Sequence, residues 1–275
     1  REVNGSRRWI SIAGLSFQPS EFVKYLVPAY FIHRFLQFKD GVLILKDFLR
    51  LLGVVAIPMF LILIEPNNGT VAVIAIAIVV LCLLTRISFK YWGVPLLAFV
   101  MIGSVSAYHL PYVTARLKVY LHPELDLKGK GHQPYQAKIA AGSGGFIGRG
   151  PGNSLQKMSY LPEAQNDYIA AIFAEEFGFL GILVLICLYL SLGLGGFTLA
   201  LRAPDNAGLY YAGALVFLFT LQAFLNMGVV SGLLPSTGLN LPLFSQGGSS
   251  LMANLTGIGV LLSIREKDGK CRINC

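Results

Sequence analysis

Charged side chains are scarce in this sequence. Asp, Glu, Lys and Arg make up 13% of its 275 residues, whereas a soluble globular domain carries roughly a quarter. Long runs are almost free of charge, and each supplies the ~20 apolar residues that a membrane-spanning helix needs. Because a helix satisfies its backbone hydrogen bonds internally, helices are the default spanning element. The scarcity of charge therefore predicts an all-α fold, a polytopic transmembrane helical bundle.

The sequence also lacks a cysteine framework, a metal-ligand spacing of histidines and a tract for binding nucleic acid. Cys82 and Cys187 lie in apolar runs and are interpreted as packing residues. Cys271 and Cys275 lie in a polar tail, where a metal or redox pair and a palmitoylation site are alternatives. No basic tract is interleaved with aromatic residues, so the net charge of +8 indicates membrane lipids as partners and no nucleic acid.

An initiating Met and a signal sequence are absent as well. The chain opens with REVNGSRRW, which is typical of an internal loop. We therefore expect the sequence to be the C-terminal piece of a longer protein.

Hydrophobic patterning predicts a single integral membrane domain over residues 1–275. The expected spans are 20–38, 51–65, 69–85, 91–110, 166–200, 207–230 and 248–264. A long, Gly-rich and charged loop, 111–162, has too few apolar runs to bury a core of its own. The turn-rich segment 226–250, which leads into the last span, is interpreted as a re-entrant or interfacial loop.

Lys and Arg are distributed unevenly over the short connections between the expected spans. Eleven lie on one side of the membrane and three on the other. Because basic residues favour cytoplasmic loops, we expect a cytoplasmic C-terminus, with residue 1 and the loop 111–162 on the extracytoplasmic side. A complete protein with a cytoplasmic N-terminus would then have an odd number of further spans upstream.

The stretch LPEAQNDYIAAIFAEE, 161–176, gathers four of the fourteen acids. Its pattern predicts one helix of about thirty-five residues that begins at Pro162, with Glu163 favourable in the first turn. Glu163 and Asp167, at i and i+4, then share a face with small residues at 170, 174, 178 and 181. Small residues let helices pack closely, so both acids are expected over a helix–helix seam. The alternative is an acidic turn that caps the helix.

The other two acids of that stretch, Glu175 and Glu176, point away from this face at 100° per residue. We expect them to pair with basic groups on neighbouring helices.

A second charged constellation lies in GSRRWISIAGLSFQPSEFVK, 5–24. Pro19 marks a helix start, with Ser20 as the N-cap or Glu21 as an early-turn acid. A lysine inside a span is costly unless it is partnered. We therefore expect Lys24 to pair with Glu21, three residues before it.

Two further stretches can bind anions. Arg7, Arg8 and Trp9 fit either an interfacial anchor or a clamp for phosphate. AAGSGGFIGRGPGNS, 140–154, contains six glycines, and Gly-rich backbone beside basic residues forms anion-binding nests. A flexible loop has the same composition, so both interpretations stay open.

Taken in order, these stretches resemble the FtsW/RodA family, the shape, elongation, division and sporulation (SEDS) proteins. The resemblance covers essentially the whole chain and implies further spans upstream of residue 1. Its motifs are NGSRRWI and FQPSEFVK (4–24), EPNNGT (65–70), RLKVYLHPELDLKGKGHQPYQ (116–136), SGGFIGRGPGNSLQK (143–157), LPEAQNDYIAAIFAEEFGFLG (161–181) and NMGVVSGLLPSTGLNLPLFSQGGSSL (226–251).

The resemblance implies polymerisation of lipid II into peptidoglycan glycan strands in bacterial cell division or cell-shape maintenance. The active site would lie outside the cytoplasmic (inner) membrane. The implied partners are a class B penicillin-binding protein, which is a transpeptidase, and the division or elongation machinery. The alternatives are a lipid II flippase or transporter, and a non-catalytic scaffold that recruits the transpeptidase.

The family's essential acid falls on Asp167, expected either as the general base for the acceptor hydroxyl or as a ligand of a divalent cation, Mg²⁺ or Mn²⁺. The departing pyrophosphate needs positive charge and hydrogen bonds. The residues expected to bind substrate and pyrophosphate are Arg7, Arg8, Trp9, Glu21, Lys24, Arg116, Lys138, Ser143, Gly144 and Gly145. The expected supporting residues are Glu163, Ser245, Gly247, Gly248 and Ser249.

The chain departs from the family pattern at three places. Gln165 stands where the family commonly has His, and Gln246 where it commonly has Tyr or His. EPNNGT replaces the common QPDxGT. Asp167 is retained, so activity is expected.

Overall fold

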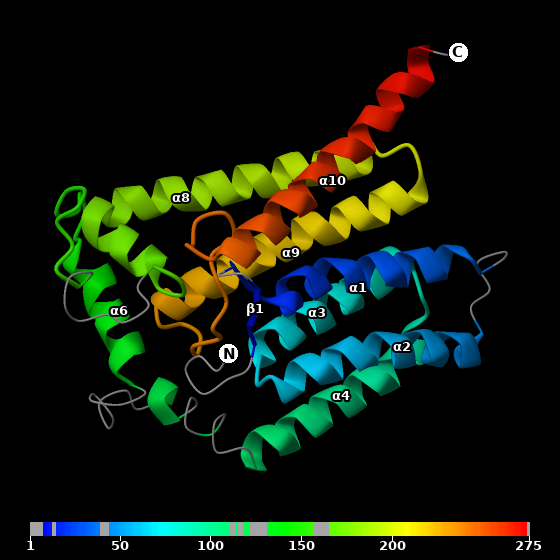
Figure 1. Ribbon diagram of the computed structural model, residues 1–275, viewed down its shortest axis with the longest axis horizontal. Coiled ribbons are helices and arrows are strands. Elements are labelled where there is room, and N and C mark those ends of the chain that lie inside the picture. Colours follow the sequence, from blue (N-terminus) through cyan, green and yellow to red (C-terminus); the bar gives the residue numbers. More distant parts are fainter. Residues whose placement is uncertain are drawn as a thin grey trace. The chain divides into compact units, whose positions relative to one another are not determined.

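The computed structural model describes residues 8–12, 15–38, 44–109, 114, 118–121, 131–156 and 165–273. Seven of its helices fall on the seven predicted spans, so the all-α prediction is confirmed. The helices, shown in Figure 1, are α1 (Pro19–Leu36), α2 (Leu45–Ile64), α3 (Asn68–Leu84), α4 (Phe89–His109), α6 (His132–Ser143), α8 (Ile169–Leu201), α9 (Asn206–Val230) and α10 (Gly248–Ile273).

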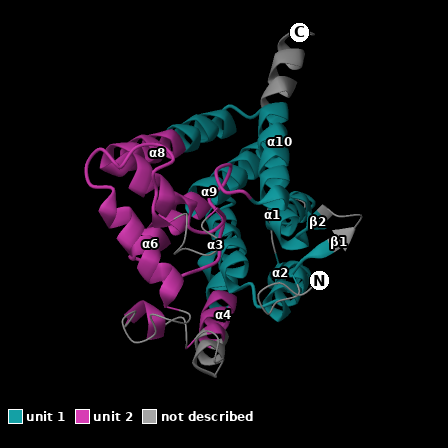
Figure 2. Ribbon diagram, turned by 60° about the vertical axis from the view of Figure 1, so that its left-hand side comes forward, with its two compact units in different colours: residues 1–94, 191–221, 247–275 teal, residues 95–190, 222–246 magenta. Residues whose placement is uncertain are grey.

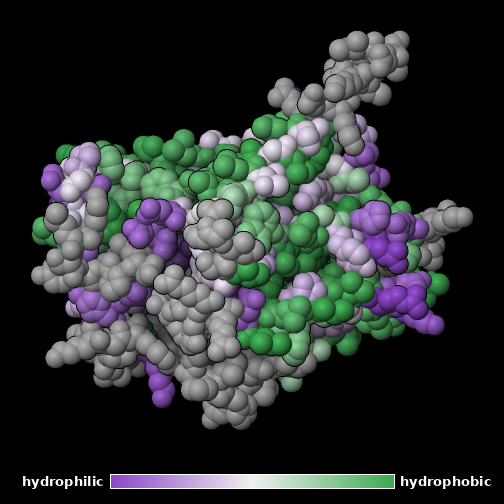
Figure 3. All heavy atoms as spheres, in the orientation of Figure 1, coloured by the Kyte–Doolittle hydropathy of each residue, from purple (hydrophilic) through white to green (hydrophobic). Residues whose placement is uncertain are grey.

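Within the described part of the chain, three helices are long and apolar enough to cross a membrane: α2, α8 and α9. Shorter apolar stretches lie at Asn68–Leu84, Phe89–Met101 and Gly248–Ile264. Large apolar side chains stay exposed on α1, α2 and α8, and apolar residues cover much of the described surface in Figure 3. Such surface is stable against lipid and not against water. The protein is therefore a multi-pass membrane protein.

The chain divides into two compact units, coloured separately in Figure 2. Unit 1 comprises residues 1–94, 191–221 and 247–275, and unit 2 comprises 95–190 and 222–246. Helices α8 and α9 therefore each contribute one part to unit 1 and the other part to unit 2.

In unit 1, α1 packs against α2, α3 and α10. Phe31, Phe48, Ile74 and Leu81 are fully buried in this unit. The strands β1 (Ile10–Ile12) and β2 (Leu15–Phe17) form an antiparallel hairpin before α1, and α10 packs against β2. The hairpin was not predicted, because three-residue strands are too short to show a period of two.

Helix α1 begins at Pro19, as predicted, with Glu21 in its first turn. Ser20 as the N-cap is wrong, because the N-cap position is held by Gln18 and no side chain caps there. The Ser20 hydroxyl instead accepts hydrogen bonds from Gln18 Nε2 (3.1 Å) and Asn67 Nδ2 (3.3 Å). It therefore joins the start of α1 to the start of α3.

In unit 2, α6 lies within the segment expected to be a loop. Its buried residues are Ala137 and Ala140, which pack in a cluster with Tyr168 and Val229. Two alanines on a helix that also carries Gly, Gln and Lys make a weak periodic signal. The helix therefore escaped prediction, although it connects the start of α8 to the end of α9.

The prediction of one continuous helix from Pro162 is wrong for the described residues. Residues 165–168 form a turn, α8 begins at Ile169, and Gly178 breaks it with φ 66° and ψ −163°. Asp167 therefore does not share a helix face with the small residues that follow. Periodicity missed the break because both halves are apolar. Pro162 and Glu163 lie outside the described residues.

The Gly-rich segment 144–150 fills the break in α8. The amides of Arg149 and Gly150 donate to the carbonyl oxygens of Glu175 and Glu176, both at 3.0 Å. These carbonyls end the first half of α8 and have no partner within it. The loop therefore supplies the donors that the helix break removes.

The same segment also serves the second half of α8. The amides of Phe179 and Leu180 donate to the carbonyl oxygens of Gly145 (3.0 Å) and Phe146 (3.2 Å). These amides begin a helix and lack acceptors inside it. Backbone groups shielded from water must be paired. The loop therefore pairs the backbone groups that the break in α8 would otherwise leave without partners.

Glu175 fastens the chain that follows this loop. Its carboxylate, 1% exposed, accepts hydrogen bonds from Ser154 Oγ (2.5 Å), Leu155 N (3.2 Å) and Gln156 N (3.4 Å). Arg149 Nη1 lies 3.7 Å away. Glu175 therefore pairs with a basic residue as predicted, but that residue lies in the loop and not on a neighbouring helix.

Candidate functional site

Asp167 lies in a turn whose backbone is held from one side. Carbonyls of three consecutive residues accept hydrogen bonds from the segment 226–246. The three bonds are Gln246 N to Gln165 O (3.0 Å), Ser245 Oγ to Asn166 O (2.7 Å) and Asn226 Nδ2 to Asp167 O (2.9 Å). We call this set of bonds the turn clamp. It holds the backbone of the Asp167 turn at three consecutive carbonyls.

The clamping segment is itself ordered by side chains of α9. Asn226 Nδ2 also donates to Leu239 O (2.8 Å), and Gln222 Nε2 donates to Asn240 O (2.8 Å). Further along, Leu241 N donates to Ser245 Oγ (2.8 Å). The segment from 231 to 247 contains no helix, as predicted. Ser245, an expected supporting residue, thus holds both its own loop and the Asp167 turn.

Asp167 itself is half-buried, at the edge of the core of unit 2. The next residue, Tyr168, is buried, as are Ala170 and Ala171 in the first turn of α8. Because the turn is anchored in a packed core, the carboxylate stands on rigid backbone.

Among the predicted cations that the structure describes, Lys138 is the one in the same unit as Asp167. It projects from α6 into a pocket that is also lined by Tyr120 and Ser236. Its side chain lies against Gly232, which has φ +78° and leaves no room for a Cβ there. Arg116 lies outside the described residues.

Ser143, Gly144 and Gly145 follow Lys138 at the end of α6. Ser143 Oγ donates to Ala140 O (3.0 Å). A Cβ on Gly144 would overlap Ala174 O, so glycine is required for contact with α8. The loop amides of Arg149 and Gly150, expected in an anion-binding nest, are instead bonded to α8. Substrate binding by residues 143–145 stays a prediction.

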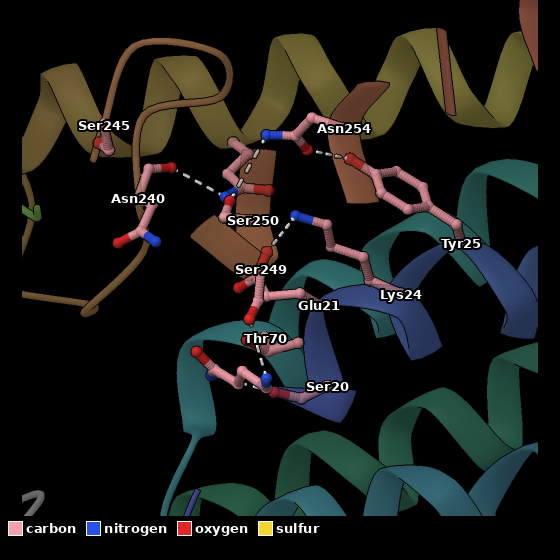
Figure 4. A network of polar contacts seen from close by, with 12 residues as sticks. Ser20, Glu21, Lys24, Tyr25, Thr70, Asn240, Ser245, Ser249, Ser250 and Asn254 are labelled. Carbon is pink, nitrogen blue, oxygen red and sulfur yellow. Dashed lines mark hydrogen bonds and ion pairs between the residues drawn. The ribbon is translucent and has the colours of Figure 1, made fainter. Parts of the chain in front are cut away.

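In unit 1, Glu21 and Lys24 form the predicted ion pair. Lys24 Nζ lies 2.8 Å from Glu21 Oε2, and the two residues are 2% and 5% exposed. Lys24 Nζ also lies 5.0 Å from the Tyr25 ring centre, and the Tyr25 hydroxyl donates to Asn254 Oδ1 (2.5 Å), as Figure 4 shows. The pair therefore belongs to a buried polar network between α1 and α10.

The start of α10 completes this network. Ser249 Oγ accepts from Gln18 N (3.0 Å) and donates to Ser16 O (3.1 Å). Gly247 O accepts from the amide of Leu251 (2.8 Å), and Gly248 begins the helix. Of the expected supporting residues, Ser249 thus connects α10 to the hairpin and to the start of α1, whereas Gly247 and Gly248 lie at the start of α10 itself.

Replacing Lys24 by Met is expected to destabilise the fold by about 3 kcal/mol, because Glu21 would remain as an unpaired buried charge. Thermal unfolding in detergent measures the loss. The double variant Glu21→Gln/Lys24→Met should recover most of the stability, since it removes both charges. Equal losses in the single and double variants would show that the charge pair is not the cause.

Arg8 holds the end of α2. Its Nε donates to Glu65 O (2.8 Å) and its Nη2 to Pro66 O (2.5 Å). A guanidinium suits helix carbonyls that lack internal partners. This contact gives Arg8 a structural role at the end of α2, and both predictions for it, the interfacial anchor and the phosphate clamp, stay predictions; Trp9, beside it, is half-buried. Arg7 lies outside the described residues.

Glu65 ends α2 with its Oε2 atom buried and without a hydrogen-bond partner among the described residues. Burial raises the pKa of the Glu65 carboxyl above its ordinary value, and the Arg8 guanidinium opposes this effect. The raised pKa means that the native state binds this proton more tightly than the unfolded state does. The resulting stability is present below the unfolded pKa of about 4.3 and is lost as pH rises through the folded pKa.

Glu65→Gln is therefore expected to stabilise the protein at neutral pH, by about 1 kcal/mol or less because solvent screens a partly exposed carboxyl. The advantage should disappear near pH ~4, where the wild-type carboxyl is protonated. Thermal midpoints of both proteins across this range test the prediction. A pH-independent difference would contradict it.

Sequence reasoning missed Asn226, which belongs to the turn clamp, and Gln222, which holds the loop before α10 at Asn240 O. The available signal was a pair of amides at i and i+4 in an otherwise apolar span, a position where polar groups are costly and functional. It also missed that Glu175 fastens the Gly-rich loop, since the contact joins residues about twenty positions apart.

Comparison with known families matches residues 1–270 to the family of FtsW, RodA and SpoVE, described as "Cell cycle protein". A probable peptidoglycan glycosyltransferase FtsW of Trichlorobacter lovleyi is 37% identical over 96% of this chain and 69% of its own. Stage V sporulation protein E of Bacillus subtilis is 37% identical over 95% of this chain and 72% of its own.

Solved structures agree. One, from work on structural coordination of polymerization and crosslinking by a peptidoglycan synthase complex, superposes with a TM-score of 0.77 at 27% identity, covering 97% of this chain and 75% of its own. The crystal structure of the rod shape determining protein RodA of Thermus thermophilus has a TM-score of 0.64 at 26% identity, covering 97% and 71%. By sequence and by fold, this chain belongs to the FtsW/RodA/SpoVE family.

Proposed function

We propose that this protein is a peptidoglycan glycosyltransferase that polymerises lipid II. The acceptor sugar's 4-hydroxyl attacks the anomeric carbon of the donor, and undecaprenyl pyrophosphate leaves. Family membership over residues 1–270 and the glycosyltransferase name of the similar FtsW proteins support the reaction. The observation that carries the site assignment is the half-buried Asp167 on a clamped turn.

Asp167 acts as the general base. A base must stand within hydrogen-bond reach of the hydroxyl whose proton it takes. Three backbone hydrogen bonds hold its turn, so little reorganisation is needed when the acceptor arrives. Its partial exposure lets a hydroxyl reach the carboxylate.

Lys138 is the best-supported contact for the departing pyrophosphate. It lies in the same unit as Asp167 and forms no ion pair within the described residues. Arg8 and Lys24 are already engaged, with helix carbonyls and with Glu21 respectively. A free ammonium can neutralise phosphate charge as a point charge.

A divalent cation, Mg²⁺ or Mn²⁺, is the alternative role for Asp167. The described residues contain no group of three His, Cys, Asp or Glu side chains that would hold a metal. Mg²⁺ is commonly bound by one or two carboxylates together with substrate phosphates. Asp167 with the pyrophosphate oxygens fits that pattern, and the ion would then neutralise the leaving group.

The reaction is placed outside the bacterial cytoplasmic membrane, with the C-terminus in the cytoplasm. The excess of Lys and Arg on one side of the predicted membrane supports this orientation. The partner is a class B penicillin-binding transpeptidase of the division or elongation machinery. A solved relative comes from a peptidoglycan synthase complex that coordinates polymerization and crosslinking, which supports a partner of this kind.

The decisive experiment gives purified lipid II to the full-length protein in detergent, with and without the partner transpeptidase, and separates the products by size. Glycan strands are expected in at least one condition. A flippase would make none in detergent, because its activity needs a sealed bilayer. A scaffold would make no strands with or without the transpeptidase. Strands would then appear only when another polymerase is added.

A further inference from the structure

We infer that Asn226 is a positioning residue for Asp167, which it holds through the backbone. The inference rests on the proposed function and concerns how the base is aimed. Asn226 lies in the last turns of α9, and its side-chain amide reaches the carbonyl oxygen of Asp167 (2.9 Å) across fifty-nine residues of sequence.

The Asn226 amide uses both of its N–H groups. One meets Asp167 O, and the other meets Leu239 O at 2.8 Å. An amide NH₂ has two donors and no more. A single side chain therefore links three segments: α9, the turn before α8 and the loop before α10.

The orientation of this amide follows from its neighbours. Turning it over would place Oδ1 against two carbonyl oxygens, which are acceptors as well. In the observed orientation Oδ1 is buried and has no hydrogen-bond partner among the described residues. Leaving a buried acceptor unpaired is unfavourable. The observed orientation therefore leaves one acceptor unpaired but keeps both N–H donors bonded to the carbonyls of Asp167 and Leu239.

The contact acts on the catalytic carboxylate through one residue of backbone. The Asp167 carbonyl and side chain share the same Cα, so a shift of the carbonyl turns the carboxylate. Misplacing a reacting group by about 1 Å costs up to 10²-fold in rate. Gln246 and Ser245 hold the two preceding carbonyls, but neither holds that of Asp167.

Gln222 provides a matched control. It lies one turn earlier on α9, is equally buried, and donates to Asn240 O (2.8 Å). Gln222→Leu therefore removes the bond to Asn240 O and loosens the same loop, one residue away from the Leu239 contact. It leaves the bond from Asn226 to Asp167 in place. A purely structural role would make the two positions equivalent.

The test compares full-length wild type, Asn226→Leu, Asn226→Asp and Gln222→Leu in polymerisation of purified lipid II. Asn226→Leu is expected to lower kcat about tenfold or more, with KM within about twofold, because the base and not the binding site is displaced. Asn226→Asp should lose as much, since a carboxylate cannot donate to two carbonyls. Gln222→Leu should stay within about threefold of wild type. Equal kcat losses at positions 222 and 226, or a rise in KM alone, would overturn the inference.

Thermal unfolding in detergent shows whether each variant is folded. Should Asn226→Leu fail to fold, Asn226→His and Asn226→Ala decide instead: the Nδ1–H of histidine lies as many bonds from Cβ as the asparagine Nδ2–H and keeps one donor, so its kcat should exceed that of the alanine variant. Equal values would overturn the inference. A wild-type protein that makes no glycan overturns the proposed function, whereas an active wild type with an unimpaired Asn226→Leu variant overturns this inference alone.

Discussion

Asp167→Asn is expected to abolish polymerisation of purified lipid II, with a rate loss of at least about 10²–10⁴-fold, the range typical of a general base. An amide cannot accept the proton of the acceptor hydroxyl at neutral pH. The substitution keeps the shape of the side chain, and the turn clamp acts on the backbone carbonyl. The variant should therefore insert, fold and bind its transpeptidase as the wild type does.

Asp47→Asn is the matched control, because Asp47 lies in the first turn of α2 and pairs only loosely with Arg50 at 4.0 Å. It should retain wild-type activity. Normal polymerisation by Asp167→Asn would remove Asp167 from the mechanism.

The same variant separates the two roles of Asp167. The side-chain carbonyl oxygen of asparagine can ligate a divalent cation, but it is too weak a base to take the proton of a hydroxyl. If Asp167 is a metal ligand, activity of Asp167→Asn should recover as Mg²⁺ or Mn²⁺ is raised. If it is the base, titration with either cation should leave the activity lost. Initial rates across a cation series decide between them.

Gly178→Ala is expected to prevent folding, with a loss on the order of 5 kcal/mol or more. The φ of 66° and ψ of −163° at Gly178 lie in a region that is essentially restricted to glycine. An added Cβ would overlap Gly148 N and lie 2.7 Å from Ile147 C. These are backbone atoms of the segment that fills the break, so they cannot move aside without disturbing the hydrogen bonds that their neighbours in the segment form with α8.

Gly142→Ala in α6 serves as the control. A Cβ there meets nothing within 4 Å, and alanine favours a helix over glycine by about 1 kcal/mol. Yield of monodisperse protein and the thermal midpoint measure both variants. A Gly178→Ala protein with a wild-type midpoint would mean that the loop 144–150 does not dock into α8 as described.

Much of the fold was predictable because lipid-facing helices have a composition of their own. All seven expected spans coincide with helices, although α2 begins at Leu45 and not at residue 51. Its first two turns carry Lys46, Asp47 and Arg50. A search for apolar runs leaves such charged residues out, although the end of a spanning helix tolerates them. The pairing of Lys24 with Glu21 was equally accessible, since i and i+3 are neighbours on any helix.

Composition therefore predicted the helical membrane fold, and the resemblance of the sequence motifs to the FtsW/RodA family pointed to Asp167 as the acid to test. Contacts between segments far apart in the sequence decided how Asp167 is held. No periodicity shows that Gly178 breaks α8, because the conformation depends on the docked loop 144–150. Nor does spacing show that Asn226 reaches Asp167. A hydrogen bond depends on distance in space, and only the folded chain brings residues 226 and 167 within 3 Å of each other.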